Sequence, residues 1–106
     1  MPTPVEVRTD RRGDGTVVLS VTGELDLSNV EAFSNAIAAA LSRHGQEAGR
    51  LAVDLAAVEY LDSAAINALF DHAAQIRRIV ANPILMSVLT ISGLTSVVEV
   101  AAAEAD

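Results

Sequence analysis

A hydroxyl and a set of carboxylates are the side chains of this sequence whose spacing could support chemistry. The serine, Ser63, directly follows an aspartate, and the carboxylates lie near the ends of expected strands: Glu24, Asp26, Asp54, Glu59 and Asp62. Sites in α/β proteins collect at the carboxyl ends of strands. These side chains could therefore form an acid–base pair or bind Mg²⁺. We favour the simpler interpretation of helix caps and solvated loops, because no phosphate-binding glycine loop and no second metal-ligand motif accompanies them.

Ser63 has two interpretations. As a structural residue, it or Asp62 caps the helix that follows. As a functional residue, it presents a hydroxyl where a helix opens towards solvent. A phosphate there would be attracted by the helix N-terminal dipole and would add about −1.5 to −2 charges. It would also sit beside Asp62, so it could leave the fold intact and still spoil a binding surface.

Other catalytic chemistry has little support in the sequence. The chain has no cysteine, which excludes disulfides, thiolate metal sites and cysteine catalysis. His44 and His72 are not at metal-ligand spacing from each other. Nothing places a histidine beside Ser63 for a serine-hydrolase triad. We therefore expect no metal site.

Length and charge restrict the class of protein. The 106 residues predict one domain, 1–106, and the net charge of −7 argues against partners that are nucleic acid or anionic membrane surfaces. No apolar run approaches the roughly 18 residues of a membrane span. The start, MPTPVEVRTD, lacks the apolar core of a signal peptide, so we expect a cytoplasmic location. The charge suits a protein that binds a basic or mixed patch on a partner.

The hydrophobic pattern predicts the elements that position these residues. Strands are expected around 5–7 and at 16–23, 51–55, 77–82 and 96–100. Helices are expected at 28–45, from 62 or 63 onward, and from 83 to about 92. This order predicts an α/β domain with a small, largely parallel sheet, an N-terminal hairpin and helices packed against the sheet. The tail, 101–106, is expected to fray.

Two apolar stripes predict the inward faces of the first two helices. Ser28 and Glu31 form a capping box at the start of the first helix. Its stripe consists of Val30, Phe33, Ile37 and Leu41. The stripe of the second helix consists of Ile66, Leu69, Phe70, Ala73 and Ile76.

Three stretches together carry a family resemblance. They are VTGELDLSNVEAF at 21–33, LAVDLAAVEYLDSAAINALF at 51–70 and SVLTISGLTSVVEV at 87–100. In order and approximate spacing they resemble bacterial anti-sigma factor antagonists of the STAS domain superfamily. The resemblance implies a single STAS domain with no enzyme activity and no cofactor. It implies a protein that binds an anti-sigma factor, often a GHKL-type serine kinase, and thereby releases a sigma factor.

The resemblance also implies roles for individual residues. Ser63 matches the serine that the kinase phosphorylates to end the association, and a phosphatase restores it. Asp62 matches the aspartate of the same motif, and Asp26 matches an acidic residue of the partner-facing surface. We add the neighbouring residues of the second helix, so the expected partner-binding residues are Asp26, Asp62, Ser63, Ala64 and Asn67.

One departure from the family pattern keeps a second function open. The usual run is Asp-Ser, a second hydroxyl residue and Gly, whereas this chain has Asp62-Ser63-Ala64-Ala65. Alanine favours a helix over glycine by about 0.8–1 kcal/mol, so the helix start should be stiffer and leave a kinase less backbone freedom. The alternative function is a STAS subunit of a lipid-transport or stress-sensing complex, which needs no phosphoserine.

Overall fold

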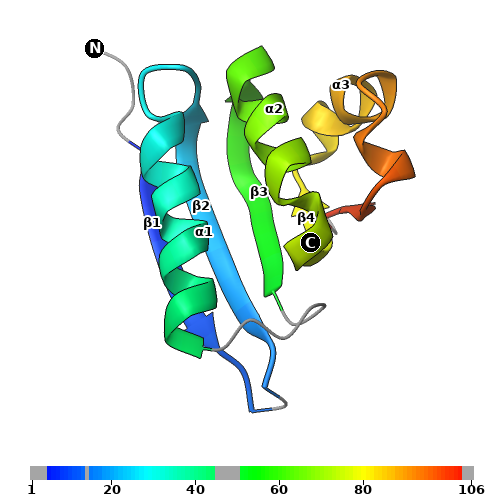
Figure 1. Ribbon diagram of the computed structural model, residues 1–106. Helices are drawn as coiled ribbons and strands as arrows, with labels where there is room; N and C mark the ends of the chain where they lie inside the picture. The colour runs from blue at the N-terminus through cyan, green and yellow to red at the C-terminus, as the bar shows by residue number, and fades with distance from the viewer. Residues whose placement is uncertain (1–4, 14, 45–50, 104–106) are drawn as a thin grey trace.

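Five strands lie side by side in the sheet in the same order as in the sequence (Figure 1). The computed structural model describes residues 5–13, 15–44 and 51–103, without the side chains of Arg43 and His44. The strands are β1 (Glu6–Arg11), β2 (Val17–Leu25), β3 (Leu51–Leu61), β4 (Ile76–Ala81) and β5 (Glu99–Ala102). The helices are α1 (Val30–His44), α2 (Ser63–His72) and α3 (Met86–Ile91), with single 3₁₀ turns at Ala73–Gln75, Pro83–Leu85 and Leu94–Ser96.

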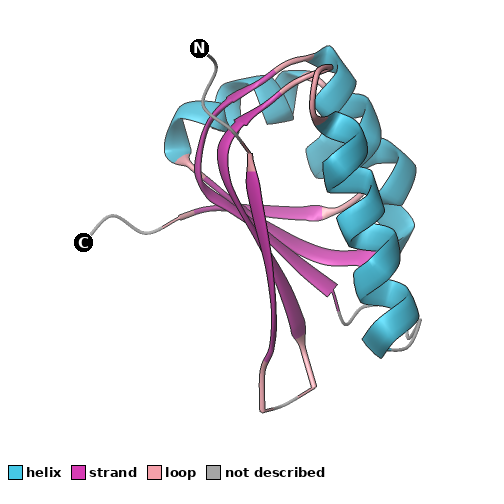
Figure 2. Cartoon of the chain, turned by 90° about the vertical axis from the view of Figure 1, so that its left-hand side faces the viewer, coloured by secondary structure: helices cyan, strands magenta, loops and turns pink. Residues whose placement is uncertain are grey.

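The sheet is mostly parallel. Strands β1 and β2 form an antiparallel hairpin, and each later strand is parallel to the one before it. A helix therefore crosses over between each parallel pair, as parallel pairing requires. Figure 2 shows α1 and α2 on the same side of the sheet, and α3 follows the end of β4. The predicted α/β fold with its N-terminal hairpin is confirmed.

Two strands differ from their predicted bounds at their C-terminal ends. Strand β3 was predicted to end at residue 55, but it continues to Leu61. The apolar alternation that marks its first half is broken after Leu55 by two bulges, where the register against β2 shifts. Strand β2 continues to Leu25 rather than ending at 23.

The last strand lies later in the chain than predicted. It covers Glu99–Ala102 instead of 96–100, because the residues before it form a 3₁₀ turn that ends at Ser96. Ala101 and Ala102 pair with the last residues of β4, so the prediction that they fray was wrong. Residues 104–106 of the predicted tail lie outside the described residues.

Helix α1 packs as its apolar stripe predicted. Phe33 and Ile37 are fully buried, and Val30 and Leu41 are partly buried against the core. None of the helices in the described ranges is long and apolar enough to cross a membrane.

Helix α2 packs against the core with its predicted residues Ile66, Leu69 and Phe70, and also with two alanines that the prediction left out. Its buried residues are Ala65, Ala68 and Leu69, whereas Ile66 and Phe70 are only half-buried. Alanine has a small side chain, so a helix with alanines inward can lie close to a sheet. Ile76 does not belong to the helix and begins β4 instead.

The core lies between the sheet and these helices. Strand residues Leu19, Leu55 and Ile79 and the helix residues Phe33 and Leu69 are all fully buried. Burying each such side chain contributes about 1.5–3 kcal/mol of hydrophobic free energy. The core fixes the strand ends, and with them the loops that follow β2 and β3.

Candidate functional site

The carboxylate of Asp62 joins the loops that follow β2 and β3. Asp62 is the N-cap residue of α2, and its Oδ1 accepts a hydrogen bond from the Ala65 N–H at 3.0 Å. Its Oδ2 accepts a hydrogen bond from the Leu27 N–H at 2.9 Å. The Asp62 N–H donates to the carbonyl of Leu25 at 3.3 Å. One side chain therefore fixes both the start of α2 and the loop before α1.

These contacts keep Asp62 ionised. The hydrogen bond from the Ala65 N–H is the largest influence and lowers the pKa of Asp62 below its ordinary value of 3.8. Partial desolvation opposes this shift, and the hydrogen bond from the Leu27 N–H lowers the pKa further. At neutral pH the carboxylate beside Ser63 is therefore negatively charged.

Ser63 is the first residue of α2, and its side chain is exposed. The sequence left open whether it or Asp62 caps the helix, and the structure gives that role to Asp62. Within the described ranges the Ser63 hydroxyl has no hydrogen-bond partner. It lies at the positive end of the helix dipole, where backbone N–H groups lack partners within the helix. The position combines an accessible hydroxyl with a setting that favours added negative charge.

The exposed face of α2 continues from Ser63 along the helix. Asn67 and Asp71 follow at four-residue steps, so all three side chains share one face, and all three are exposed. Ala64 lies next to this face and is half-buried. The predicted surface residues Ser63, Ala64 and Asn67 are therefore neighbours on the first two turns of α2.

Asp26 closes the turn before α1. Its Oδ1 accepts hydrogen bonds from the Ser28 N–H at 2.9 Å and from the Ser28 hydroxyl. The Asn29 side chain accepts from the Asp26 N–H at 3.0 Å and donates to the Glu24 carbonyl at 2.8 Å. The predicted capping box was wrong, because the helix begins later, at Val30, and Ser28 donates its hydroxyl proton to Asp26. Asp26 directly precedes the residue that binds Asp62, so the site includes it.

Three residues near this site were missed by sequence reasoning. Leu27 is 75% exposed and Tyr60 is 48% exposed, although both are large and apolar in character. Asn29 holds the turn through its side chain amide. The only sequence signal for the exposure of Leu27 is its place inside the polar run Asp-Leu-Ser-Asn, in which it is the one apolar residue.

The carboxylates do not assemble into one chemical centre. Asp26, Asp54 and Asp62 each accept hydrogen bonds from nearby backbone N–H groups, and Asp54 does so from Ala56 at 2.9 Å. Within the part of the chain that the structure describes, no group of three or more His, Cys, Asp or Glu side chains could hold a metal ion. What the arrangement offers is an exposed hydroxyl on a rigid, acidic surface.

Comparison with known proteins identifies the family. Residues 8–100 match the family model described as "Mlab, STAS domain". No curated protein matches the sequence. The structure is similar to that of an anti-sigma factor antagonist from Mycobacterium paratuberculosis, with a TM-score of 0.81 and 25% identity, covering 95% of this chain and 88% of that one.

The fold is also similar to that of SpoIIAA, another anti-sigma factor antagonist. The unphosphorylated form gives a TM-score of 0.68 over 93% of this chain and 89% of that one. The phosphorylated form, from Bacillus, gives 0.62 over 93% and 92%. At 19% identity, these two likenesses show the fold alone. Because the family model spans most of the sequence, the chain belongs to the STAS domain family.

Proposed function

We propose that this protein is an anti-sigma factor antagonist that binds an anti-sigma factor and so releases a sigma factor. The similarity to the Mycobacterium paratuberculosis antagonist over 95% of the chain supports this role. In this proposal the partner is a GHKL-type serine kinase in the cytoplasm, and a phosphatase reverses its action. The contact region, here called the Ser63 surface, consists of Asp26, Asp62, Ser63, Ala64 and Asn67.

The observation that carries the proposal is the exposed Ser63 hydroxyl on the first turn of α2. A kinase needs an accessible hydroxyl, and Ser63 offers one beside a residue that already caps the helix. A phosphate on Ser63 would be attracted by the helix dipole, so α2 would stay folded. The phosphate would also add about −1.5 to −2 charges next to the ionised Asp62. Phosphorylation would therefore change the surface without unfolding the protein.

The loss of binding free energy that phosphorylation must cause is modest. A 100-fold loss of affinity corresponds to about 2.7 kcal/mol. An added dianion in the middle of an interface, facing partner groups arranged for a neutral hydroxyl, can supply that amount through repulsion and desolvation.

The test is to mix the purified protein with candidate kinase-type anti-sigma factors and ATP, and to weigh the intact chain by mass spectrometry. We expect a gain of one phosphate that disappears in Ser63→Ala. Ser87→Ala is the matched control, since Ser87 is also exposed but lies on α3. A phosphate gain that persists in Ser63→Ala would refute the assignment to Ser63. Stable binding without a mass gain would keep the antagonist role and remove its control by phosphorylation.

A second function is favoured by Ala64 and Ala65. Ala65 is fully buried and its N–H is bound by Asp62, so the position where the family pattern has glycine is a fixed part of the helix here. A STAS subunit of a lipid-transport or stress-sensing complex would need no movement of this segment. Co-purification with a defined ATPase or membrane complex, together with no binding to any kinase-type anti-sigma factor, would favour this function over the first.

A further inference from the structure

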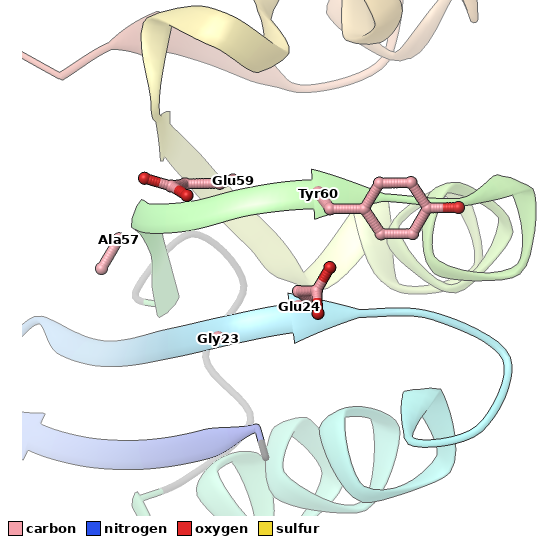
Figure 3. A pocket seen from close by; sticks show the side chains of 5 residues that line it. All are labelled: Gly23, Glu24, Ala57, Glu59 and Tyr60. Atoms are coloured by element: carbon pink, nitrogen blue, oxygen red, sulfur yellow. The ribbon is translucent and has the colours of Figure 1, made fainter. Parts of the chain in front are cut away.

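A hollow opens at the C-terminal ends of β2 and β3 (Figure 3). Its volume is about 540 Å³, and its lining consists of Gly23, Glu24, Ala57, Glu59 and Tyr60. Glu24 lies two residues before Asp26, and Tyr60 lies two residues before Asp62. The hollow therefore adjoins the Ser63 surface along both strands, although the proposed function does not use it.

A β-bulge builds the hollow. Gly23 pairs with Val58, whereas the next residue, Glu24, pairs with Tyr60, so Glu59 is an extra residue in β3. In a regular strand, consecutive side chains point to opposite faces. Here the bulge leaves Glu59 and Tyr60 both exposed. Figure 3 shows these two side chains on β3 and Glu24 on β2, across from Tyr60. Gly23 on β2 and Ala57 on β3 are the two smallest lining residues, and they leave room beside these longer side chains.

The rim combines two carboxylates with an aromatic ring. In the described ranges neither the Glu24 carboxylate nor the Glu59 carboxylate has a hydrogen-bond or ion-pair partner. The Tyr60 ring is half-exposed and extends past the end of β3 (Figure 3). A guanidinium group satisfies both kinds of lining at once, because it binds carboxylates through paired N–H groups and stacks on aromatic faces. The ammonium group of lysine can also lie over an aromatic ring, but it is not planar, so it neither stacks on the ring nor binds a carboxylate through paired N–H groups.

We propose that this hollow binds an arginine side chain of the protein partner that covers the Ser63 surface. The occupant follows from charge complementarity, since the lining is acidic and the chain carries a net charge of −7. It follows also from position, since Asp26 and Asp62 lie in the loops just after β2 and β3, two residues beyond Glu24 and Tyr60. The inference rests on the proposed function for the identity of the partner, but the preference of the hollow for guanidinium can be measured without any partner.

The first experiment uses the protein alone. Tyr60 is the only tyrosine and the chain has no tryptophan, so intrinsic fluorescence reports on the rim of the hollow. N-acetyl-arginine amide is titrated into the protein, with N-acetyl-citrulline amide as the neutral isostere and N-acetyl-lysine amide as the alternative cation. We expect a saturable fluorescence change with arginine, a weaker one with lysine and none with citrulline. Amide NMR shifts should concentrate at Gly23 and Ala57.

Variants separate the hollow from general acidity. Glu59→Gln should weaken binding of the arginine probe by about two- to fivefold, the range for an exposed ion pair. Tyr60→Leu should weaken it similarly when followed by NMR. Glu31→Gln is the matched control, because it removes one exposed carboxylate on α1 away from the hollow, and its affinity should equal that of the parent. Thermal unfolding of each variant confirms that it is folded.

The outcomes are distinguishable from those of the proposed function. Equal binding of arginine and citrulline, or equal effects of Glu59→Gln and Glu31→Gln, would overturn the hollow as a guanidinium site whether or not an anti-sigma factor binds. If an anti-sigma factor binds Glu59→Gln and Tyr60→Leu as tightly as the parent, the partner places no arginine there and the inference is wrong, while the antagonist role stands. If no anti-sigma factor binds the parent, the proposed function fails, and the probe titration still decides the chemistry of the hollow.

Discussion

The double use of the Asp62 carboxylate makes Asp62→Asn an informative perturbation. Asparagine has nearly the same size as aspartate and is an equally good N-cap residue. Its side chain, however, has one acceptor oxygen and one NH₂ group, which only donates. In the parent, Oδ1 binds the Ala65 N–H and Oδ2 binds the Leu27 N–H. The variant must give up one of these two contacts, and it then places an NH₂ group against a backbone N–H.

We expect the contact with Leu27 to be lost. The cap contact lies within one local turn, whereas the Leu27 contact joins residues 35 apart in sequence and can open without disturbing α2. The melting temperature should fall by about 2–5 °C, as expected for the loss of one contact in a domain of this size. Hydrogen exchange at the Leu27 amide should become faster by about tenfold or more, while the Ala65 amide keeps its protection.

Asp54→Asn supplies the matched control. The Asp54 carboxylate accepts one backbone hydrogen bond, from the Ala56 N–H at 2.9 Å, and an asparagine oxygen can accept it equally well. Its melting temperature should stay within about 1 °C of the parent. An unchanged exchange rate at Leu27 in Asp62→Asn, or equal losses of stability in the two variants, would refute the account of Asp62 as a bridge between the loops.

The same comparison has a pH dependence of defined sign. The pKa of Asp62 is lowered by folding, so its charge stabilises the folded state above its ordinary pKa of 3.8, and this contribution is lost as the pH falls through the lowered value. The difference in melting temperature between the parent and Asp62→Asn should be constant near neutral pH and should shrink below pH 3.8. A difference that grows as the pH falls would contradict the direction of the shift.

The remaining predictions concern the surface, the core and one turn. Ser63→Asp should leave the melting temperature nearly unchanged but weaken binding to the anti-sigma factor by about 100-fold in a titration. Ser87→Asp should bind like the parent. Equal affinities of the two variants would contradict the proposal. Phe33→Ala should lower the free energy of unfolding by about 3–5 kcal/mol because Phe33 is fully buried, whereas Leu27→Ala should change it by less than about 0.5 kcal/mol in the same denaturant titration. Gly93→Ala should lower the free energy of unfolding by about 1–2 kcal/mol, because Gly93 has a φ of +90°, which strains any residue with a Cβ. No clash should add to this cost, since the new Cβ would meet only Phe70, at an ordinary 4.0 Å. A cost near zero would show that the turn after α3 can relax.

The strand and helix order was predictable because apolar residues alternate in β2 and in the first half of β3, and recur at helical spacing in α1. The second half of β3 could not be predicted from the spacing of its apolar residues. Two bulges each place two consecutive residues between buried ones, Ala56-Ala57 and Glu59-Tyr60, and a strand with bulges has no simple alternation. The sequence therefore predicts a short strand where the protein has a long one.

The candidate site, too, could be predicted from the sequence only in part. Asp62 and Ser63 were recognisable as a helix start, because an aspartate and a serine precede a helical apolar run. Which of the two caps the helix depends on hydrogen-bond geometry that the sequence does not contain. The contact between Asp62 and Leu27 depends on two loops meeting at the end of a folded sheet, so no local pattern could predict it.

The consecutive strand order also bears on how the chain acquires its structure. Each strand pairs with the next one along the chain, so no strand has to enter between two that are already paired. During synthesis the β1–β2 hairpin leaves the ribosome first and is closed by one short turn, at small entropic cost. Every later strand then adds to an open edge after one helix has been made. Folding can therefore keep pace with translation, and at each stage the unpaired edge of the newest strand is the part of the nascent chain most exposed to aggregation.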